Sequence, residues 1–265
     1  MLKLGVIDVL NVLPVFYGIS SHKIKVDCEL VFDKVTQLNQ KLNRGEIDCS
    51  VISSFEYALN PDIYFILPDL SISADGPVKS IYLFLKKPLE DLRNDTIVLT
   101  EFSLTSVHLI QFLLKDFLID FTQDKTIGAT GELLIADEAI KRFYDNKDPY
   151  IYDLSELWKV KTGLPFVFAL WVIRRDSFYK NRKAALKLYH SILHSKGISS
   201  EFIPEMAKEK NNGIFPEDKL CEDYLKNLHY EFSKPYQRGF NLFQDKMLQL
   251  HKLQKKAPLN FLPLD

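Results

Sequence analysis

The feature that most constrains the fold is a continuous apolar run near the middle of the chain, Phe166 to Ile173. It lies within Thr162–Arg175, TGLPFVFALWVIRR, where Gly163 and Pro165 signal a turn before the run and two arginines follow it. Its β-branched and aromatic residues are typical of a strand that is buried on both faces. The run is too short to cross a bilayer as a helix. We therefore expect it to be an internal strand of a sheet.

A second apolar run, Ile81 to Leu85, follows the turn-rich segment Ser73–Ser80, SADGPVKS. About 80 residues with their own strand and helix signals separate the two runs. This pattern predicts an α/β protein of two lobes that are joined by two crossovers. We expect one lobe to comprise residues 1–85 and 170–265 and the other residues 86–169. A small ligand is expected between them, because interfaces between domains favour such sites.

The composition excludes several classes of partner. The chain has 265 residues, of which 46% are hydrophobic and 26% charged, as in an ordinary soluble globular protein. Its 34 Lys and Arg residues nearly balance 35 Asp and Glu, and a net charge of -1 gives no support for a nucleic-acid or membrane partner. No secretory leader opens the sequence, so we expect a cytoplasmic protein. The sequence carries no indication of oligomeric state.

Polar residues follow three of the expected strands, at the positions where helices would begin. In an open α/β sheet these positions face the ligand crevice, and a helix start offers free backbone N–H groups to a carboxylate or phosphate. The alternative is simple helix capping, with Asn11 as the cap of the first helix. The residues concerned are Asn11, Ser53, Ser54, Ser103, Thr105 and Ser106.

The remaining chemistry-bearing residues give weaker indications. Asp137 follows a predicted strand and fits either a base or a helix cap, and Lys79 fits either an anion contact or a solvated side chain. The six histidines show no metal-ligand pairing, and Cys28, Cys49 and Cys221 are scattered without metal or redox spacing. Nucleotide-binding, hydrolase and zinc-protease motifs are absent from the sequence. The residues therefore give no indication of a metal site.

Six segments, in this order, resemble chorismate dehydratase of the futalosine route to menaquinone. The resemblance implies a two-lobed fold like the type II periplasmic binding proteins, with mixed sheets flanked by helices and two crossover strands. It also implies a cytosolic enzyme that converts chorismate to 3-[(1-carboxyvinyl)oxy]benzoate and water without a cofactor. The segments are LNVLPVFYG (Leu10–Gly18), SSFEYA (Ser53–Ala58), SADGPVKSIYL (Ser73–Leu83), SLTSVHL (Ser103–Leu109), LLIADEAI (Leu133–Ile140) and YDLSELWKVKTGLPFVFALW (Tyr152–Trp171).

The resemblance also assigns roles to residues of this chain. Asn11 matches the family's active-site asparagine, and we expect it to hold the reacting groups while the enolpyruvyl carboxylate of the substrate takes the proton. The other matching positions are expected to bind the substrate: Ser53, Ser54, Ser80, Ser103, Thr105, Ser106 and Asp137. The chain departs from the common family pattern at Val9, where many members have Tyr, and at Ala136, where many have Gly.

Two other functions compete with this one. Dihydroxynaphthoate synthase, the sister enzyme of the pathway, shares the fold class and is expected to use a histidine base. None of the histidines of this chain lies in a turn after a strand, which argues against that enzyme. A cytosolic small-anion binding protein without enzymatic activity is the other alternative, and turnover distinguishes it from the dehydratase.

Overall fold

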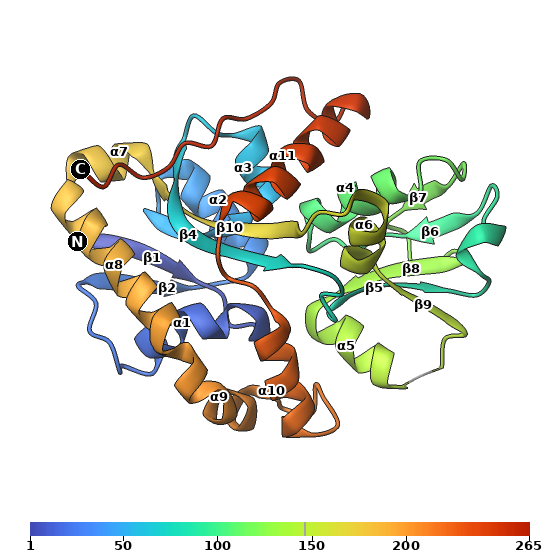
Figure 1. Ribbon diagram of the computed structural model, residues 1–265, viewed down its shortest axis with the longest axis horizontal. Helices are drawn as coiled ribbons and strands as arrows, with labels where there is room; N and C mark the ends of the chain where they lie inside the picture. The colour runs from blue at the N-terminus through green and yellow to red at the C-terminus, as the bar shows by residue number, and fades with distance from the viewer. Residues whose placement is uncertain (146) are drawn as a thin grey trace.

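The computed structural model describes residues 1–145 and 147–265. Two five-stranded sheets, each with parallel and antiparallel neighbours, are flanked by helices (Figure 1). The strand order is β2-β1-β3-β10-β4 in the first sheet and β7-β6-β8-β5-β9 in the second. The predicted α/β class and mixed sheets are therefore confirmed. We call the half that contains the first sheet lobe one and the half that contains the second sheet lobe two.

The elements follow one another with short connections. The strands are β1 (Leu2–Val6), β2 (Cys28–Phe32), β3 (Cys49–Ser53), β4 (Tyr64–Ala74), β5 (Ile81–Leu85), β6 (Thr96–Val98), β7 (Asp120–Thr122), β8 (Gly131–Ile135), β9 (Tyr150–Asp153) and β10 (Phe166–Arg174). The helices are α1 (Leu13–Ser20), α2 (Val35–Arg44), α3 (Ser54–Leu59), α4 (Leu104–Leu113), α5 (Ala136–Asp145), α6 (Leu154–Thr162), α7 (Arg175–Lys180), α8 (Arg182–Ile198), α9 (Ile203–Lys210), α10 (Asp218–Asn227) and α11 (Lys234–Gln249).

Strand β10 contains the long apolar run and is an internal strand, as predicted. It pairs antiparallel with β3 on one side and with β4 on the other. Its aromatic residues are buried on both faces, and Trp171 packs edge-on against Phe16 of α1 with ring centroids 5.7 Å apart. Because both neighbours hold β10 by backbone hydrogen bonds, the strand fixes the wall of lobe one that faces lobe two.

The boundary between the lobes differs from the expected one. Strand β5 pairs with β8 and β9, so residues 81–85 belong to the second sheet and not to lobe one. The chain passes from lobe one to lobe two in the turn that ends at Ser80. It returns to lobe one through residues 163–165, which lead into β10. An apolar run reads as a buried strand in either sheet, which is why its composition did not reveal its lobe.

The segments after β10 support lobe one and close one border of its sheet. Tyr230 and His229 lie along β4, where Ser71 N–H donates to the Tyr230 carbonyl and Ser73 exchanges two backbone hydrogen bonds with His229. Farther along the same border, Ile66 pairs with the segment 260–262. The outer border of β4 is therefore occupied by the chain itself, as Figure 1 shows for the C-terminal segment.

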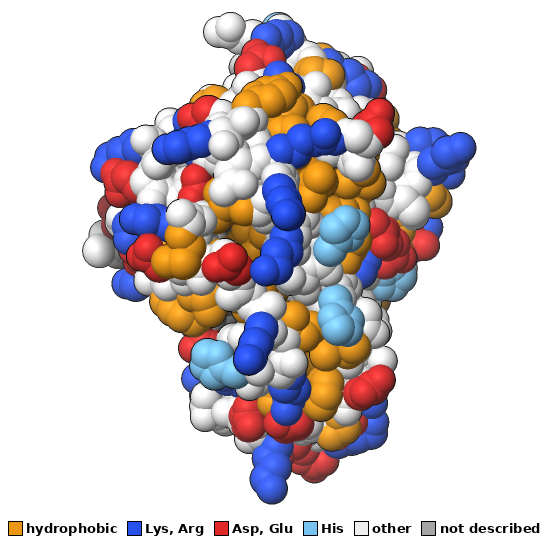
Figure 2. Space-filling view, turned by 90° about the vertical axis from the view of Figure 1, so that its left-hand side faces the viewer, with side chains coloured by type: hydrophobic (Ala, Val, Ile, Leu, Met, Phe, Trp, Pro, Cys, Tyr) orange, Lys and Arg blue, Asp and Glu red, His pale blue; other side chains and the backbone are white. Residues whose placement is uncertain are grey.

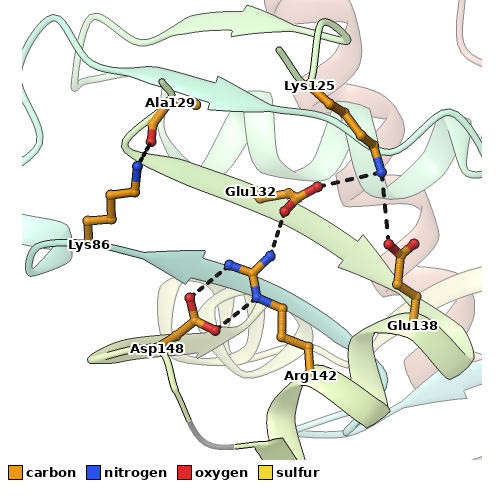
Figure 3. A network of polar contacts seen from close by, with 7 residues as sticks. All are labelled: Lys86, Lys125, Ala129, Glu132, Glu138, Arg142 and Asp148. Atoms are coloured by element: carbon orange, nitrogen blue, oxygen red, sulfur yellow. Dashed lines mark hydrogen bonds and ion pairs between the residues drawn. The ribbon is translucent and has the colours of Figure 1, made fainter. Parts of the chain in front are cut away.

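The outer surfaces carry many charged side chains. Figure 2 shows lysine and histidine side chains on the face of lobe one that includes α8, where His190 and His194 are exposed. In lobe two, Arg142 binds Glu132 and Asp148 and thereby ties α5 to its sheet (Figure 3). Within residues 1–145 and 147–265, every helix is too short or too polar to cross a membrane.

Candidate active site between the lobes

A cavity of about 930 Å³ opens between the two lobes. Strand ends and helix starts from both sheets form its wall, together with apolar side chains such as Ile72, Ile81 and Phe168. Six of the eight predicted site residues line it: Asn11, Ser53, Ser80, Ser103, Ser106 and Asp137. A flat apolar ring with polar substituents would meet both kinds of surface in this cavity.

Asn11 lies in a different local structure from the one expected. It is the middle residue of a 3₁₀ turn, Leu10–Val12, and Val12 precedes the first residue of α1. The Asn11 side chain makes no capping hydrogen bond, so the prediction of a helix cap is wrong. Its Oδ1 atom is buried without a hydrogen-bond partner. Buried polar atoms are nearly always paired, so the amide of Asn11 remains available for a purpose other than capping.

Ser53 and Ser103 cap helices, as the capping interpretation predicts. Ser53 Oγ accepts the N–H of Glu56 at 3.1 Å at the start of α3. Ser103 Oγ accepts the N–H of Ser106 at 3.1 Å at the start of α4 and donates to Ser106 Oγ at 2.9 Å. These two helix starts come from opposite lobes and both reach the cavity. They offer it hydroxyl groups and the positive ends of two helix dipoles.

Ser54 and Thr105 lie behind the cavity wall. Both side chains are almost fully buried, and their oxygens are 3.4 Å apart. Ser54 Oγ donates to the Val167 carbonyl at 2.8 Å, and Thr105 Oγ1 accepts the N–H of Phe55 at 3.1 Å. Neither residue lines the cavity, and both hydroxyls are bonded to other protein groups. The pair instead joins α3 of lobe one to α4 of lobe two.

The turn before β5 places Ser80 in the cavity wall beside Asp137. Ala136 N–H donates to the Ser80 carbonyl at 2.8 Å, which holds the start of α5 against this turn. Ala136 has a φ of 52°, in the left-handed region where glycine carries no steric penalty. An alanine in this conformation is therefore a source of local strain. Lys79 is exposed to solvent and does not line the cavity.

Asp153 fixes the preceding part of the same turn. Its buried carboxylate accepts the backbone N–H groups of Val78 at 3.1 Å and Lys79 at 2.7 Å. It also accepts those of Ser155 and Glu156 at the start of α6. One carboxylate therefore anchors the crossover to lobe two, and this anchor determines where Ser80 can lie.

The cavity is lined by more acidic than basic side chains. Lys34 is the single cation among the described lining residues, whereas Asp8 and Asp33 also line the cavity. These two aspartates are paired with Lys210 and Lys41. A dianionic ligand would therefore have to be held mainly by hydroxyl, amide and backbone N–H groups.

Two carboxyl groups on the cavity wall are partly withdrawn from water. Burial raises the pKa of the Asp137 carboxyl and that of the Glu56 carboxyl. Glu56 accepts a hydrogen bond from Asn60 Nδ2 at 2.8 Å, which opposes this effect. None of the six histidines lines the cavity, and no metal-binding group of His, Cys, Asp or Glu occurs within residues 1–145 and 147–265.

The model of a family described as "Menaquinone biosynthesis" matches residues 2–249. The chain belongs to the menaquinone biosynthesis family. Chorismate dehydratase of Thermus thermophilus is 31% identical to this chain. The match covers 79% of this chain and 83% of the Thermus thermophilus protein. Chorismate dehydratase of Campylobacter jejuni is 29% identical over 72% of this chain and 78% of its own length.

Solved structures resemble the family member in fold. A crystal structure from Archaeoglobus fulgidus has a TM-score of 0.69 at 17% identity and covers 95% of this chain and 98% of its own. A Candida albicans protein with the generic periplasmic binding protein fold has a TM-score of 0.67 at 13% identity. The match covers 100% of this chain and 98% of the Candida albicans chain. The predicted periplasmic-binding-protein-like architecture of this menaquinone biosynthesis family member is therefore confirmed.

Sequence reasoning missed several residues at the site. Asn39 of α2 lines the cavity, and its Oδ1 is buried without a partner, as that of Asn11 is. Tyr230 donates its phenol O–H to the Asn11 carbonyl at 3.0 Å. Asn39 lies within a helix pattern and Tyr230 lies about 60 residues beyond the last matching segment. Neither position carries a local signal that could have identified it.

Proposed function

We propose that this protein is a chorismate dehydratase, which converts chorismate to 3-[(1-carboxyvinyl)oxy]benzoate and water. The observation that carries the proposal is the 31% identity to the Thermus thermophilus chorismate dehydratase over most of both chains. The cavity supports it, because apolar walls and hydroxyl-bearing helix starts suit a six-membered ring with carboxylate substituents.

The reaction needs orientation more than a strong catalyst. Loss of the ring hydroxyl and of a neighbouring ring proton creates a benzene ring, and aromatisation provides the driving force. We assign Ser53, Ser103 and Ser106 to the carboxylates, since their helix starts supply hydrogen-bond donors and a favourable dipole. The neutral donors compensate for the scarcity of cations around the cavity.

We assign Asn11 to the reacting end of the substrate, with Ser80 and Asp137 on the facing wall. The unpartnered Asn11 amide would position the leaving hydroxyl and the enolpyruvyl group, whose carboxylate takes the ring proton. The leaving hydroxide and that proton together make the released water. Burial raises the pKa of the Asp137 carboxyl, which makes this group a better proton acceptor than a solvated aspartate.

Ser54 and Thr105 have a supporting role in this proposal. Their hydrogen bonds set the spacing between α3 and α4, and so between the Ser53 and Ser103 helix starts. The absence of histidines from the described cavity wall disfavours a histidine-dependent reaction of the sister enzyme. The family description supports a place in menaquinone biosynthesis, and we extend the proposal to the futalosine route in the cytoplasm.

Mass spectrometry of chorismate incubated with the purified protein tests this function. We expect a product that is lighter by one water and has an aromatic ultraviolet spectrum. Chorismate that binds but remains unchanged would indicate a binding protein, and conversion to prephenate alone would also overturn the proposal. Deleting the gene should abolish menaquinone, and adding 3-[(1-carboxyvinyl)oxy]benzoate should restore it if the futalosine route is correct.

The variant Asn11→Ala tests the assigned mechanism. We expect kcat to fall by about two orders of magnitude, because the substrate would no longer be held in the reactive orientation. Chorismate affinity, measured by titration calorimetry, should change by only a few-fold, since the carboxylate contacts lie on other elements. Full turnover in Asn11→Ala with unchanged binding would show that Asn11 has no catalytic role.

A further inference from the structure

The segment 218–232, formed by α10 and the residues after it, lies behind two polar parts of the cavity wall. Tyr230 donates its phenol O–H to the backbone carbonyl of Asn11 at 3.0 Å. The backbone of Tyr230 is itself held, because its carbonyl accepts the N–H of Ser71 on β4. A fixed donor in lobe one therefore contacts the 3₁₀ turn that carries Asn11.

The same segment also contacts the crossover turn. Tyr224 is a buried residue of α10, and its phenol lies near Ser80. Asn227, one turn farther along α10, donates its Nδ2 to the Pro77 carbonyl at 2.9 Å. The crossover turn is therefore held at Pro77 by Asn227 of α10, as well as at Val78 and Lys79 by Asp153.

The geometry gives the Tyr230 contact a particular consequence. The Asn11 side chain makes no capping bond, and its buried Oδ1 has no partner, so its direction depends on the backbone of the turn. That turn is a short 3₁₀ segment, whose hydrogen bonds are weaker than those of an α-helix. Burial keeps the Tyr230 pKa well above its ordinary value, so the phenol remains a donor across the working pH range.

We propose that Tyr230 is a positioning residue that holds the Asn11 turn for catalysis. This inference rests on the proposed dehydratase function. It assigns a role to a segment outside the six family-like motifs. It also explains why a buried phenol lies directly behind the asparagine.

Steady-state kinetics of Tyr230→Phe test the inference, with Tyr57→Phe as the matched control. Tyr57 is also buried, and its phenol donates to the Pro258 carbonyl at 2.7 Å and accepts the N–H of Asn260. The control thus loses at least as many hydrogen bonds but leaves Asn11 untouched. We expect kcat of Tyr230→Phe to fall about tenfold with KM within twofold, and Tyr57→Phe to keep the wild-type kcat. Equal kcat values for the two variants would overturn the positioning role.

A spectroscopic measurement separates this inference from the proposed function. Asn11–Val12 is the single Asn-Val pair in the sequence, so labelling Asn carbonyls with ¹³C and Val amides with ¹⁵N gives one correlated signal. We expect the Asn11 carbonyl to shift upfield in Tyr230→Phe, beyond any change in Tyr57→Phe, because it loses a hydrogen bond. An unchanged carbonyl shift would overturn the contact itself.

The two failures have different signatures. Wild-type protein that leaves chorismate unchanged would overturn the proposed function and the catalytic part of this inference, whatever the carbonyl signal does. Wild-type turnover together with a shifted signal and an unreduced kcat would overturn only the positioning role. A reduced kcat together with the shifted signal would support the inference in full.

Discussion

Replacing Gly239 by alanine should disturb the connection between the lobes. A Cβ atom at this position of α11 would lie 2.0 Å from the Pro165 carbonyl oxygen and 3.2 Å from its carbon. Pro165 belongs to the segment that returns the chain to β10, and its oxygen also accepts the indole N–H of Trp158 at 3.3 Å. Since the clash is with backbone, no side-chain rotation can relieve it.

The expected loss follows from two opposing effects. Overpacking against fixed backbone costs about 3 kcal/mol, and alanine recovers about 1 kcal/mol in a helix interior, which leaves about 2 kcal/mol of destabilisation. The unfolding entropy of a 265-residue chain is about 0.56 kcal/mol/K, from about 2.1 cal/mol/K for each residue. The melting temperature of Gly239→Ala should therefore fall by about 4 °C.

Differential scanning calorimetry measures this loss, and Gly197→Ala provides the control. Gly197 lies on α8, and a Cβ atom there would meet no atom within 4 Å, so alanine should raise the melting temperature slightly. Dehydratase kinetics of Gly239→Ala should show a lower kcat/KM, since the shift reaches the strand that forms the cavity wall. A Gly239→Ala protein that melts within 1 °C of wild type, by about half a kcal/mol or less, would refute the close approach.

Two further predictions concern buried carboxyl groups. Asp153→Ala should lower the free energy of unfolding, measured in urea, by about 3 kcal/mol, because four backbone N–H groups lose their acceptor. Asp153→Asn should lose less stability, because it keeps one acceptor oxygen. Equal stability of wild type and both variants would contradict this prediction. Burial raises the folded-state pKa of Asp137, so its ionisation weakens the fold as pH rises through that value. Asp137→Asn should therefore gain melting temperature relative to wild type as pH is raised from acid to neutral, and a difference that is independent of pH would argue against the raised pKa.

The sequence predicted those parts of the fold that depend on local pattern. The run Phe166–Ile173 is an internal strand because nothing but burial on both faces suits eight successive apolar residues. The serines at 53 and 103 cap helices because a short hydroxyl side chain before an apolar helix pattern satisfies free N–H groups. These features require information from only a few neighbouring residues.

The parts that the sequence did not predict depend on distant partners. Ser54 and Thr105 carry a hydroxyl group as Ser53 and Ser103 do. They lie behind the cavity wall, where Ser54 contacts Thr105 and Val167, which are distant in the sequence. Asn11 has a good capping side chain, yet the chain enters α1 through a 3₁₀ turn and leaves the amide unpartnered. Tyr230 acts across more than 200 residues, and no local pattern marks such a contact.

The border of lobe one along β4 has a consequence for self-association. An uncovered strand offers a row of N–H and carbonyl groups that can template growth by another molecule. Here the backbone groups of Ser71 and Ser73 make hydrogen bonds to residues 229–230, and those of Ile66 to residues 260–262. These groups are therefore not free to bond to a second molecule. In this sheet, strand addition by a second native molecule would have to start at the opposite border, at β2, where the exposed Glu29 puts a like charge on every incoming copy.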